Sequence, residues 1–328
     1  MTKTALVAVG GNSLIRAGEK GTIAEQLANT RRTAAAIIGL IRMGYRLVIT
    51  HGNGPQVGAQ LLRSERASDV AYSQTLDVCG AASQGEIGYL LAQSLRNELA
   101  AESMHVPVVS LVTQTLVSPN DPAMQHPSKP IGPFYSKADA EDRRRQLGWH
   151  IVEDAARGYR RVVPSPEPIE IVELDAIRSL MNDGALVVSV GGGGVPVVDD
   201  HGEFRGVEAV IDKDRASALL AARLGVDWFI ISTDTDYVYL NYKKPGQVPL
   251  KMVTAAEMKQ HLAAGHFPPG NMGPKVESVL RFLENGGHDA VITSFERLCD
   301  AVTGTAGTHI VRCGGEHEQE RELALTAG

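Results

Sequence analysis

The sequence predicts an α/β protein, in which a mostly parallel, open sheet is covered by helices on both faces as an α/β/α sandwich. Short apolar or β-branched runs alternate with longer segments of helical periodicity, and this alternation is typical of parallel strands joined by crossover helices. Glycine-rich turns follow three of the apolar runs. The 328 residues are enough for one large or two medium domains, each with its own core.

The first part of the chain alternates strands and helices most regularly. Thr22 and Glu25 have the spacing of a capping box, which predicts the start of a helix that Gly44 ends. Apolar runs on both sides of this helix predict buried strands. The predicted strands cover residues 6–9, 47–49 and 106–111, and a long helix covers residues 76–102.

The second part repeats this pattern. Thr254 and Glu257 form another predicted capping box. The remaining predicted elements are strands over residues 186–190, 228–232, 289–293 and 308–311 and a helix over residues 275–284. The charged tail that follows Cys313 is expected to be a solvated extension.

Residues 118–168 differ in composition, because prolines flank a charged middle that contains three consecutive arginines. Prolines at both ends suit two stiff connecting strands, and we interpret the segment as an inserted subdomain. A long surface excursion without a function is an equally good interpretation of the composition.

Composition excludes several classes of function. The net charge of -6 and the pI of about 5.9 argue against nucleic acid or an anionic membrane as the main partner. The sequence contains no run approaching the ~18 apolar residues of a membrane span and no signal-peptide core. Three widely spaced cysteines do not form a disulfide framework, so we expect a cytoplasmic protein.

Glycine-rich loops are the first candidate binding elements. They contain Gly10, Gly11 and Asn12, Gly52 and Asn53, and a run from Gly191 through Gly192 to Gly194. In open parallel sheets ligands bind beyond the carboxyl ends of the strands, where glycine lets backbone N–H groups approach an anion. Any single loop is better explained by a tight turn, whereas three such loops in one sheet favour a binding site. The P-loop, dinucleotide-binding and His-Glu-x-x-His patterns are absent from the sequence, which disfavours those three classes.

Three lysines are the sharper signal. Lys129 lies in a turn, whereas Lys213 and Lys275 lie at predicted helix starts, where a cation opposes the helix dipole unless an anion binds there. Asp212 and Asp214 flank Lys213, and Asp212 is also a suitable N-cap. Either lysine alone could be a tolerated surface residue. Together with the loops they indicate phosphoryl transfer by positioning and charge neutralisation. An acceptor that is already an anion, such as a carboxylate or carbamate, requires no general base.

These residues belong to long, ordered motifs. The chain resembles the carbamate kinases, which have the amino-acid kinase fold, in VGGN at residues 9–12, THGNGPQVG at 50–58, LDVC at 76–79 and QGEIGY at 84–89. The resemblance continues in KPIGPF at 129–134, GYRRVVPSP at 158–166, GGGGVP at 191–196, GVEAVIDKD at 206–214, DYV at 236–238, GHF at 265–267 and PK at 274–275.

The resemblance implies reversible phosphoryl transfer between ATP and carbamate, giving ADP and carbamoyl phosphate, with Mg²⁺ on the nucleotide. It also implies a homodimer and a use in making ATP during nitrogen catabolism. The corresponding division is an N-terminal lobe over residues 1–205, which binds carbamate and the phosphoryl group, and a C-terminal nucleotide-binding lobe over residues 206–328. The insertion at about 118–168 would be a mobile lid.

The resemblance also assigns roles to individual residues. Lys213 and Lys275 would neutralise phosphate charge, Asp214 would orient them, and Lys129 would reach in from the lid. The transferring group and the acid would bind to Gly10, Gly11, Asn12, Gly52, Asn53, Gly191 and Gly192. The nucleotide would contact Asp212, Thr233, Asp236, Tyr237, Met272 and Lys275.

The chain departs from the commonest family pattern at Asp234 and Asn271, which would change nucleotide affinity more than the type of reaction. Two alternatives stay open at this point. One is a related kinase that acts on another small acid, and the other is a binding protein that senses carbamoyl phosphate or nucleotide. A nicotinamide-dependent oxidoreductase is disfavoured by the missing dinucleotide motif.

Overall fold

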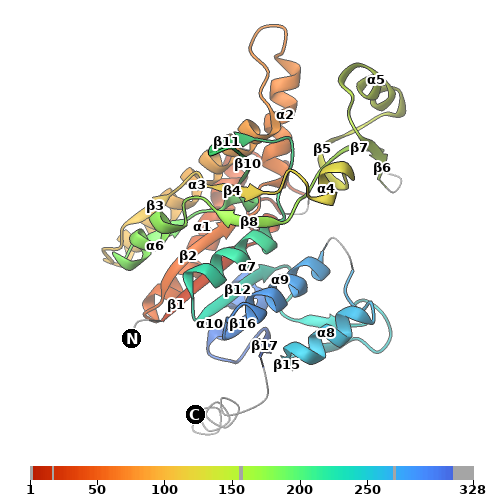
Figure 1. The fold of residues 1–328 in the computed structure, drawn as a ribbon. Helices are drawn as coiled ribbons and strands as arrows, with labels where there is room; N and C mark the ends of the chain where they lie inside the picture. Colours follow the sequence, from red (N-terminus) through yellow and green to blue (C-terminus); the bar gives the residue numbers. More distant parts are fainter. Residues whose placement is uncertain (1–2, 17, 155–157, 269–270, 313–328) are drawn as a thin grey trace, which may run out of the picture.

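An eight-stranded, almost entirely parallel sheet forms the centre of the molecule (Figure 1). The computed structural model describes residues 3–16, 18–154, 158–268 and 271–312. The strand order of this central sheet is β15-β17-β16-β12-β1-β2-β9-β3, and among its described neighbours only β16 and β17 pair antiparallel. The strands are β1 (Thr4–Val9), β2 (Arg46–His51), β3 (Val108–Ser110), β9 (Leu186–Val188), β12 (Trp228–Thr233), β15 (Met252–Thr254), β16 (Asp289–Ser294) and β17 (Thr308–Val311).

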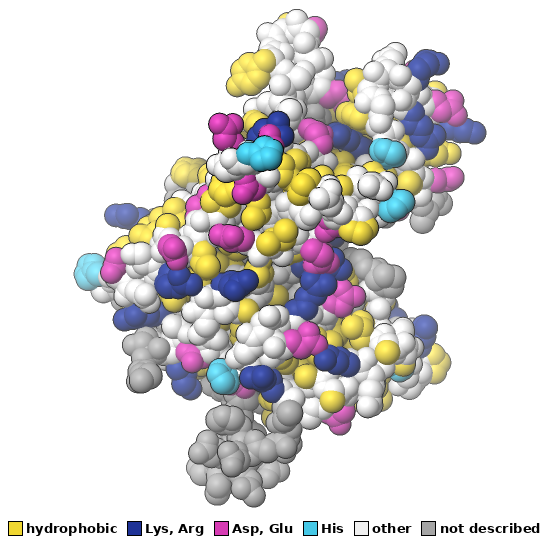
Figure 2. All heavy atoms as spheres, viewed as in Figure 1, with side chains coloured by type: hydrophobic (Ala, Val, Ile, Leu, Met, Phe, Trp, Pro, Cys, Tyr) yellow, Lys and Arg dark blue, Asp and Glu magenta, His cyan; other side chains and the backbone are white. Residues whose placement is uncertain are grey.

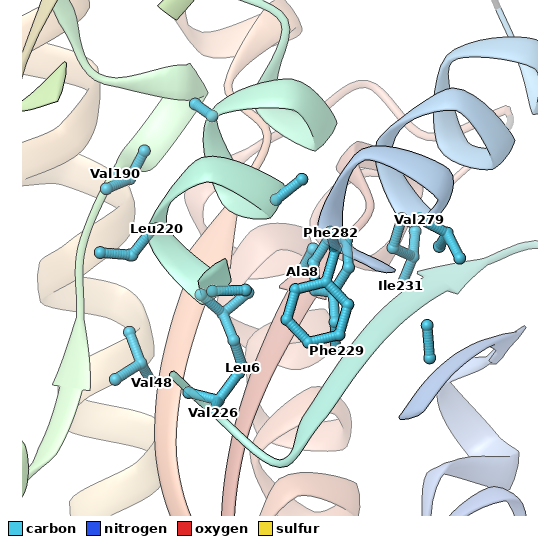
Figure 3. Packing of buried hydrophobic residues seen from close by; sticks show 14 of the residues in the cluster. Leu6, Ala8, Val48, Val190, Leu220, Val226, Phe229, Ile231, Val279 and Phe282 are labelled. Carbon is cyan, nitrogen blue, oxygen red and sulfur yellow. The ribbon is translucent and has the colours of Figure 1, made fainter. Parts of the chain in front are cut away.

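Helices cover both faces of this sheet and create two hydrophobic cores. One core packs α1 (Ile23–Arg42), α3 (Leu76–Ala101) and α10 (Leu298–Val302) against the sheet. The other packs α6 (Leu174–Asn182), α7 (Lys213–Leu224), α8 (Ala255–Ala263) and α9 (Met272–Glu284) against the opposite face. There the rings of Phe229 and Phe282 lie 5.4 Å apart between β12 and α9 (Figure 3). This arrangement confirms the predicted α/β/α sandwich.

Smaller elements surround the central sheet. A second sheet has the order β11-β10-β4-β8, and β13 and β14 form a hairpin. These strands are β4 (Gln114–Val117), β8 (Pro168–Ile171), β10 (Val195–Asp200), β11 (Glu203–Gly206), β13 (Val238–Leu240) and β14 (Val248–Leu250). The sequence pattern did not predict this second sheet, because its strands are short and carry exposed as well as buried residues.

Residues 129–163, here called the lid, have a sheet of their own, with β7 between β5 and β6. The lid elements are β5 (Lys129–Tyr135), α5 (Lys137–Leu147), β6 (Ile151–Glu153) and β7 (Tyr159–Val163). The lid lies beside α2 (Gly54–Arg66), which Arg143 reaches through an ion pair with Glu65. The short helix α4 (Pro122–Gln125) precedes the lid. The division into lobes at residue 205 stays a prediction.

The predicted helix starts are accurate where a capping box sets them. Both boxes, at Thr22 with Glu25 and at Thr254 with Glu257, form reciprocal hydrogen bonds. Several other boundaries differ from the prediction by one to three residues. Helix α9 begins at Met272, three residues before the predicted start, and β9 ends at Val188, because Val190 turns into the left-handed region with φ of 50°. The predicted tail extension lies outside the described residues.

The surface carries no large field of one sign on the face seen in Figure 2, where acidic and basic side chains are intermingled. This distribution fits the small net charge of -6. A charged ligand would therefore be attracted by local clusters of charged side chains and not by the surface as a whole. None of the helices in the described part of the chain combines the length and the apolarity needed to cross a bilayer.

Candidate active site

Three glycine-containing loops meet at the carboxyl-terminal edge of the central sheet. Strands β1, β2 and β9 are adjacent and parallel, so the loops that follow them lie side by side. A Cβ atom on Gly52 would lie 3.4 Å from the backbone nitrogen of Gly11, and one on Gly192 would lie 2.2 Å from Nδ2 of Asn53. Gly192 also has φ of 64°, which L side chains rarely adopt. Glycine therefore allows the close approach of these loops.

A cavity of about 380 Å³ opens between these loops, the lid and three helices. The N-terminal turns of α2, α7 and α9 all contribute to its wall, and helix N-termini favour bound anions. The residues that line it are Gly11, Gly52, Asn53, Gly54, Pro55, Val57, Lys129, Pro130, Ile131, Gly192, Val210, Ile211, Asp212, Lys213, Asp214, Asn271, Pro274 and Lys275.

Two lysines share one buried carboxylate in this cavity. Lys213 Nζ lies 2.5 Å from Oδ1 of Asp214, and Lys275 Nζ lies 2.9 Å from Oδ2 of the same residue. The side chain of Asp214 is only 6% exposed, and those of the two lysines are 13% and 12% exposed. Asp214 therefore holds the ammonium groups of Lys213 on α7 and Lys275 on α9 at one point.

The opposite charges of Asp214 and the two lysines determine the protonation states of the three side chains. Burial alone raises the pKa of the Asp214 carboxyl, but the charges of Lys213 and Lys275 outweigh burial and hold that pKa well below its ordinary value. Burial, together with the charge of Lys275, lowers the pKa of Lys213, and Asp214 opposes this effect. The carboxylate is therefore ionised at neutral pH and stabilises both cations.

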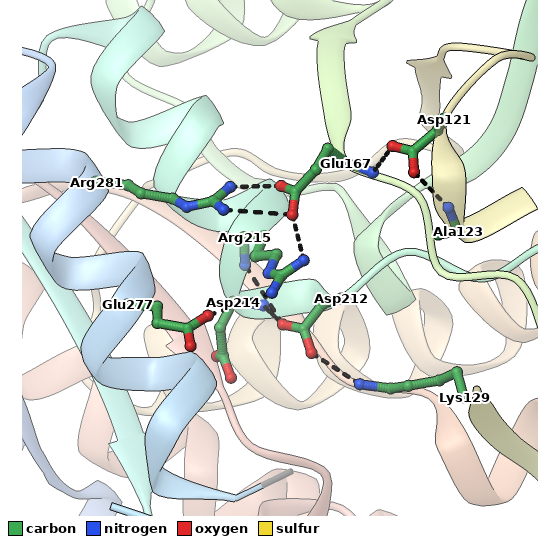
Figure 4. Close-up of polar contacts among 9 residues, drawn as sticks. All are labelled: Asp121, Ala123, Lys129, Glu167, Asp212, Asp214, Arg215, Glu277 and Arg281. Atoms are coloured by element: carbon green, nitrogen blue, oxygen red, sulfur yellow. Dashed lines mark hydrogen bonds and ion pairs between the residues drawn. The ribbon is translucent and has the colours of Figure 1, made fainter. Parts of the chain in front are cut away.

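Lys129 reaches the cavity from the first strand of the lid and pairs with Asp212 (Figure 4). Its Nζ donates to Oδ2 of Asp212 over 2.8 Å. The other carboxylate oxygen caps α7 by accepting from the backbone nitrogens of Asp214 and Arg215. The N-cap role predicted for Asp212 is confirmed. Of the two aspartates that flank Lys213, Asp214 accepts a hydrogen bond from its ammonium group, and Asp212 contributes a weaker charge interaction.

Some predicted site residues lie behind the cavity wall. The backbone nitrogen of Gly10 donates to Ser232 Oγ over 3.2 Å, and a Cβ atom on Gly191 would lie 2.5 Å from the ring of His51. These two glycines therefore allow close packing of the loops. Asn12 lies in the short helix η1 (Gly11–Ser13), and its side chain lies outside what the structure describes.

The residues predicted to contact only the nucleotide lie apart from the lysine cluster, around the end of β12 and the start of α9. Thr233 ends β12, Asp236 accepts a 2.5 Å hydrogen bond from Ser294, and the ring of Tyr237 faces that of Tyr239. Met272 begins α9 and packs against the core. None of these four residues is among the described residues that line the cavity. Strand β12 is parallel to β1 and adjacent to it, so Thr233 lies at the same edge of the sheet as the glycine loops.

The sequence reasoning missed the residues that support the loops from behind. Gln84 of α3 binds the backbone of Thr113 through both its amide nitrogen and its amide oxygen, and Thr113 Oγ1 accepts from the backbone nitrogen of Val190, just before the glycine run. Asn53 donates to Ser83 Oγ over 2.8 Å. Ser83 and Gln84 are adjacent polar residues that α3 buries, and buried polar groups require partners.

His51 is a further buried group that the prediction did not use. It ends β2, is 1% exposed, and its Nδ1 lies 3.1 Å from the carbonyl oxygen of Gly52. Burial and the nearby charge of Lys213 lower its pKa to about 4. The ring is therefore neutral at pH 7 and packs beneath the loops without adding a charge.

The cluster as a whole suits a polyanionic ligand. Lys129, Lys213 and Lys275 provide three ammonium groups against the two carboxylates of Asp212 and Asp214, which leaves one net positive charge. Within the described ranges, no group of three or more histidine, cysteine or acidic side chains is arranged to hold a metal ion. A Mg²⁺ that arrives on a nucleotide keeps phosphate and water oxygens as ligands and needs at most one or two carboxylates, so this cluster is compatible with it.

Comparisons with known proteins agree on one family. Residues 3–294 match the model of the amino acid kinase family. The chain is 49% identical over 313 residues to the carbamate kinase of Thermococcus kodakarensis, covering 94% of this chain and 99% of that protein. It is 50% identical over 308 residues to the carbamate kinase of Staphylococcus haemolyticus, covering 93% and 98%. The structure of carbamate kinase from Giardia lamblia bound to AMP-PNP matches with a TM-score of 0.91 and 42% identity, covering 95% of this chain and 99% of that chain.

Proposed function

The chain belongs to the amino acid kinase family, among its carbamate kinases, and we propose that the Lys213–Asp214–Lys275 cluster is its phosphoryl-transfer machinery. The activity is reversible phosphoryl transfer between ATP and carbamate, which gives ADP and carbamoyl phosphate. The observation that carries the assignment of the cluster is the single buried carboxylate that holds two lysines in one cavity.

The proposed mechanism follows from the charges in the cavity. A carbamate oxygen attacks the γ-phosphorus as the bond to the β-phosphate oxygen breaks, and ADP leaves with the electron pair. Lys213 and Lys275 neutralise the charge that develops on the transferring and leaving oxygens. Because carbamate is already an anion, no side chain has to remove a proton. Asp214 contributes by keeping both ammonium groups in place.

The remaining cavity residues receive supporting roles. Backbone N–H groups near Gly11, Gly52 and Gly192 cradle the phosphoryl group and the acid, because helix and loop N–H groups bind anions. Lys129 adds a third positive charge from the lid. Mg²⁺ accompanies the nucleotide and supplies charge neutralisation there. We assign the nucleotide to the region of Thr233, Asp236, Tyr237 and Met272, at the same edge of the sheet.

A homodimer and a cytoplasmic location are part of the same proposal. Exposed apolar side chains on α3 and β11, including Tyr89 and Phe204, support an interface between two copies. The described cysteines, Cys79 and Cys299, are free thiols, as expected in a reducing compartment. Sedimentation equilibrium tests the dimer, and a monomer at micromolar concentration would contradict it.

ATP formation from carbamoyl phosphate and Mg-ADP tests the proposal directly. The assay is run with the native protein, with Lys213→Ala, and with acetyl phosphate and other acyl phosphates in place of carbamoyl phosphate. We expect fast ATP formation from carbamoyl phosphate alone and its loss in the variant. Equal rates with another acyl phosphate would contradict the substrate, and a fully active variant would contradict the assigned cluster.

A further inference from the structure

A network of charged side chains joins the lid to the helices that carry the catalytic lysines (Figure 4). Glu167 lies between β7 and β8, where the chain leaves the lid. Its carboxylate pairs with Arg215 of α7 and with Arg281 of α9. Both terminal nitrogens of Arg281 donate to Glu167, and such two-pronged contacts fix orientation as well as distance.

Arg215 extends this network along the interface of α7 and α9. Its second terminal nitrogen lies 3.2 Å from Oε2 of Glu277 on α9. Arg215 directly follows Asp214, and Glu277 lies two residues after Lys275. The two helices are therefore linked inside the cavity by Asp214 and Lys275 in their first turns. Outside the cavity they are linked by Arg215 with Glu277 and by Glu167, which joins Arg215 to Arg281 in the last turn of α9.

The lid strands are attached to the start of α7 at two places. Lys129, at the beginning of β5, contacts Asp212, the N-cap of α7. On the returning strand, the carbonyl oxygen of Pro164 accepts from the backbone nitrogen of Val210 over 3.0 Å. The backbone nitrogen of Glu167 donates to Asp121, which caps α4. Prolines 164, 166 and 168 stiffen the segment around Glu167.

We propose that Glu167 is a positioning residue for phosphoryl transfer, which couples the lid to the spacing of Lys129, Lys213 and Lys275 through Arg215 and Arg281. This inference rests on the proposed role of the lysine cluster. Glu167 is not in the cavity lining and does not touch the reacting atoms. It sets where the returning strand of the lid lies relative to α7 and α9.

Glu167→Gln tests this role, because it keeps the size of the side chain and removes its charge. Misplacement of reacting groups by about 1 Å can cost on the order of 100-fold in rate, and we expect kcat to fall by about 10-fold to 100-fold. The KM values for carbamoyl phosphate and Mg-ADP and the thermal midpoint are expected to stay close to the native values. Glu167→Asp should restore part of kcat, and Arg281→Gln, which removes one arm of the network, should lower kcat less.

Glu170→Gln is the matched control, because Glu170 is an exposed glutamate on β8, three residues further along the chain. It should leave kcat unchanged. An unchanged kcat in Glu167→Gln, or a fall fully explained by a lower thermal midpoint and a smaller active fraction, would overturn the positioning role.

A double-mutant cycle with Lys129→Ala separates this inference from the proposed function. If Glu167 acts through the position of the lid lysine, the loss of kcat caused by Glu167→Gln is smaller in the Lys129→Ala background than in the native one. Equal losses in both backgrounds would overturn the coupling. Native turnover in Lys129→Ala alone would instead contradict the role proposed for Lys129, while the Glu167→Gln variant would still decide whether Glu167 positions Lys213 and Lys275.

Discussion

The two charge clusters of the cavity differ in how firmly the protein holds them. Lys213 and Lys275 are 13% and 12% exposed and share the buried Asp214, whereas Lys129 is 40% exposed and pairs with Asp212 from the lid. Charges interact strongly where water is excluded, while exposed ion pairs contribute only about 0–1 kcal/mol to stability. The first cluster is therefore held firmly by the fold, whereas the ion pair of Lys129 with Asp212 contributes little to stability.

Under the proposed function, this difference would divide the work of binding a phosphate. The Lys213–Asp214–Lys275 cluster would supply positive charge at a constant position, which lowers the reorganisation needed during transfer. Lys129 would add its charge through a contact that costs little to break. The predictions below test each side of this comparison.

Replacement of Asp214 by Asn should have the largest effect. It leaves two largely buried ammonium groups without their carboxylate, and the loss of one partner of a buried charge pair costs about 3–5 kcal/mol. We expect the free energy of unfolding from urea titrations to fall by about that amount, with activity lost as well. Asp175→Asn, at a 95% exposed side chain, is the control. A native-like unfolding free energy for Asp214→Asn would contradict the fixed cluster.

Lys213→Ala should lower turnover by on the order of 100-fold or more, as the loss of one transition-state contact does. The fold should stay intact, because Lys275 and Asp214 remain as a balanced pair. Circular dichroism and steady-state ATP formation from carbamoyl phosphate check both expectations. Near-normal turnover would remove Lys213 from the mechanism.

The lowered pKa of His51, which is buried close to Lys213, predicts a pH dependence of stability. Its pKa is about 4 in the native state and about 6.5 in the unfolded state. The unfolded state therefore binds more protons between these values, and stability falls as the pH drops through this range. We expect the residue to account for a loss of about 2 kcal/mol between pH 7.5 and 5. Urea titrations of the native protein and of His51→Gln at both pH values measure it, and equal pH dependence of the two proteins would contradict the low pKa.

Lys129→Ala should have the smallest effect of the four. Turnover is expected to fall by roughly tenfold, because a half-exposed charge is partly screened. The thermal midpoint should change by less than about 2 °C, because the ion pair contributes little to stability. Differential scanning calorimetry and the ATP assay measure the two quantities. A large loss of stability would show that the lid contact is structural.

The sequence predicted the parts of the molecule that local rules determine. The alternation of apolar runs and helical segments identified β1, α1 and β2. The Thr-x-x-Glu spacing of a capping box predicted the starts of α1 and α8, where the structure shows the reciprocal hydrogen bonds. Lys213 and Lys275 were found because cations at helix starts are unfavourable without an anion. Identification of the reaction relied on the long motifs, since glycine loops and lysines alone would suit several phosphate-binding proteins.

Contacts between distant segments could not be predicted from local patterns. Lys129 and Asp212 are 83 residues apart, and only the fold of the lid brings them together. Glu167 and Arg281 are 114 residues apart, and each has the sequence context of an ordinary surface residue. The second sheet escaped detection because its strands are short and two of them, β8 and β11, lack an alternation of buried and exposed positions.

Hydrogen exchange on the full chain tests the difference between the two clusters most directly. Backbone amides of β5, which carries Lys129, are compared with those of the first turns of α7 and α9, with and without carbamoyl phosphate and Mg-ADP. We predict that the substrates slow exchange in β5 strongly and change exchange around Lys213 and Lys275 little. Two results would contradict this account. One is equal protection of both regions without substrates, and the other is a substrate effect confined to α7 and α9.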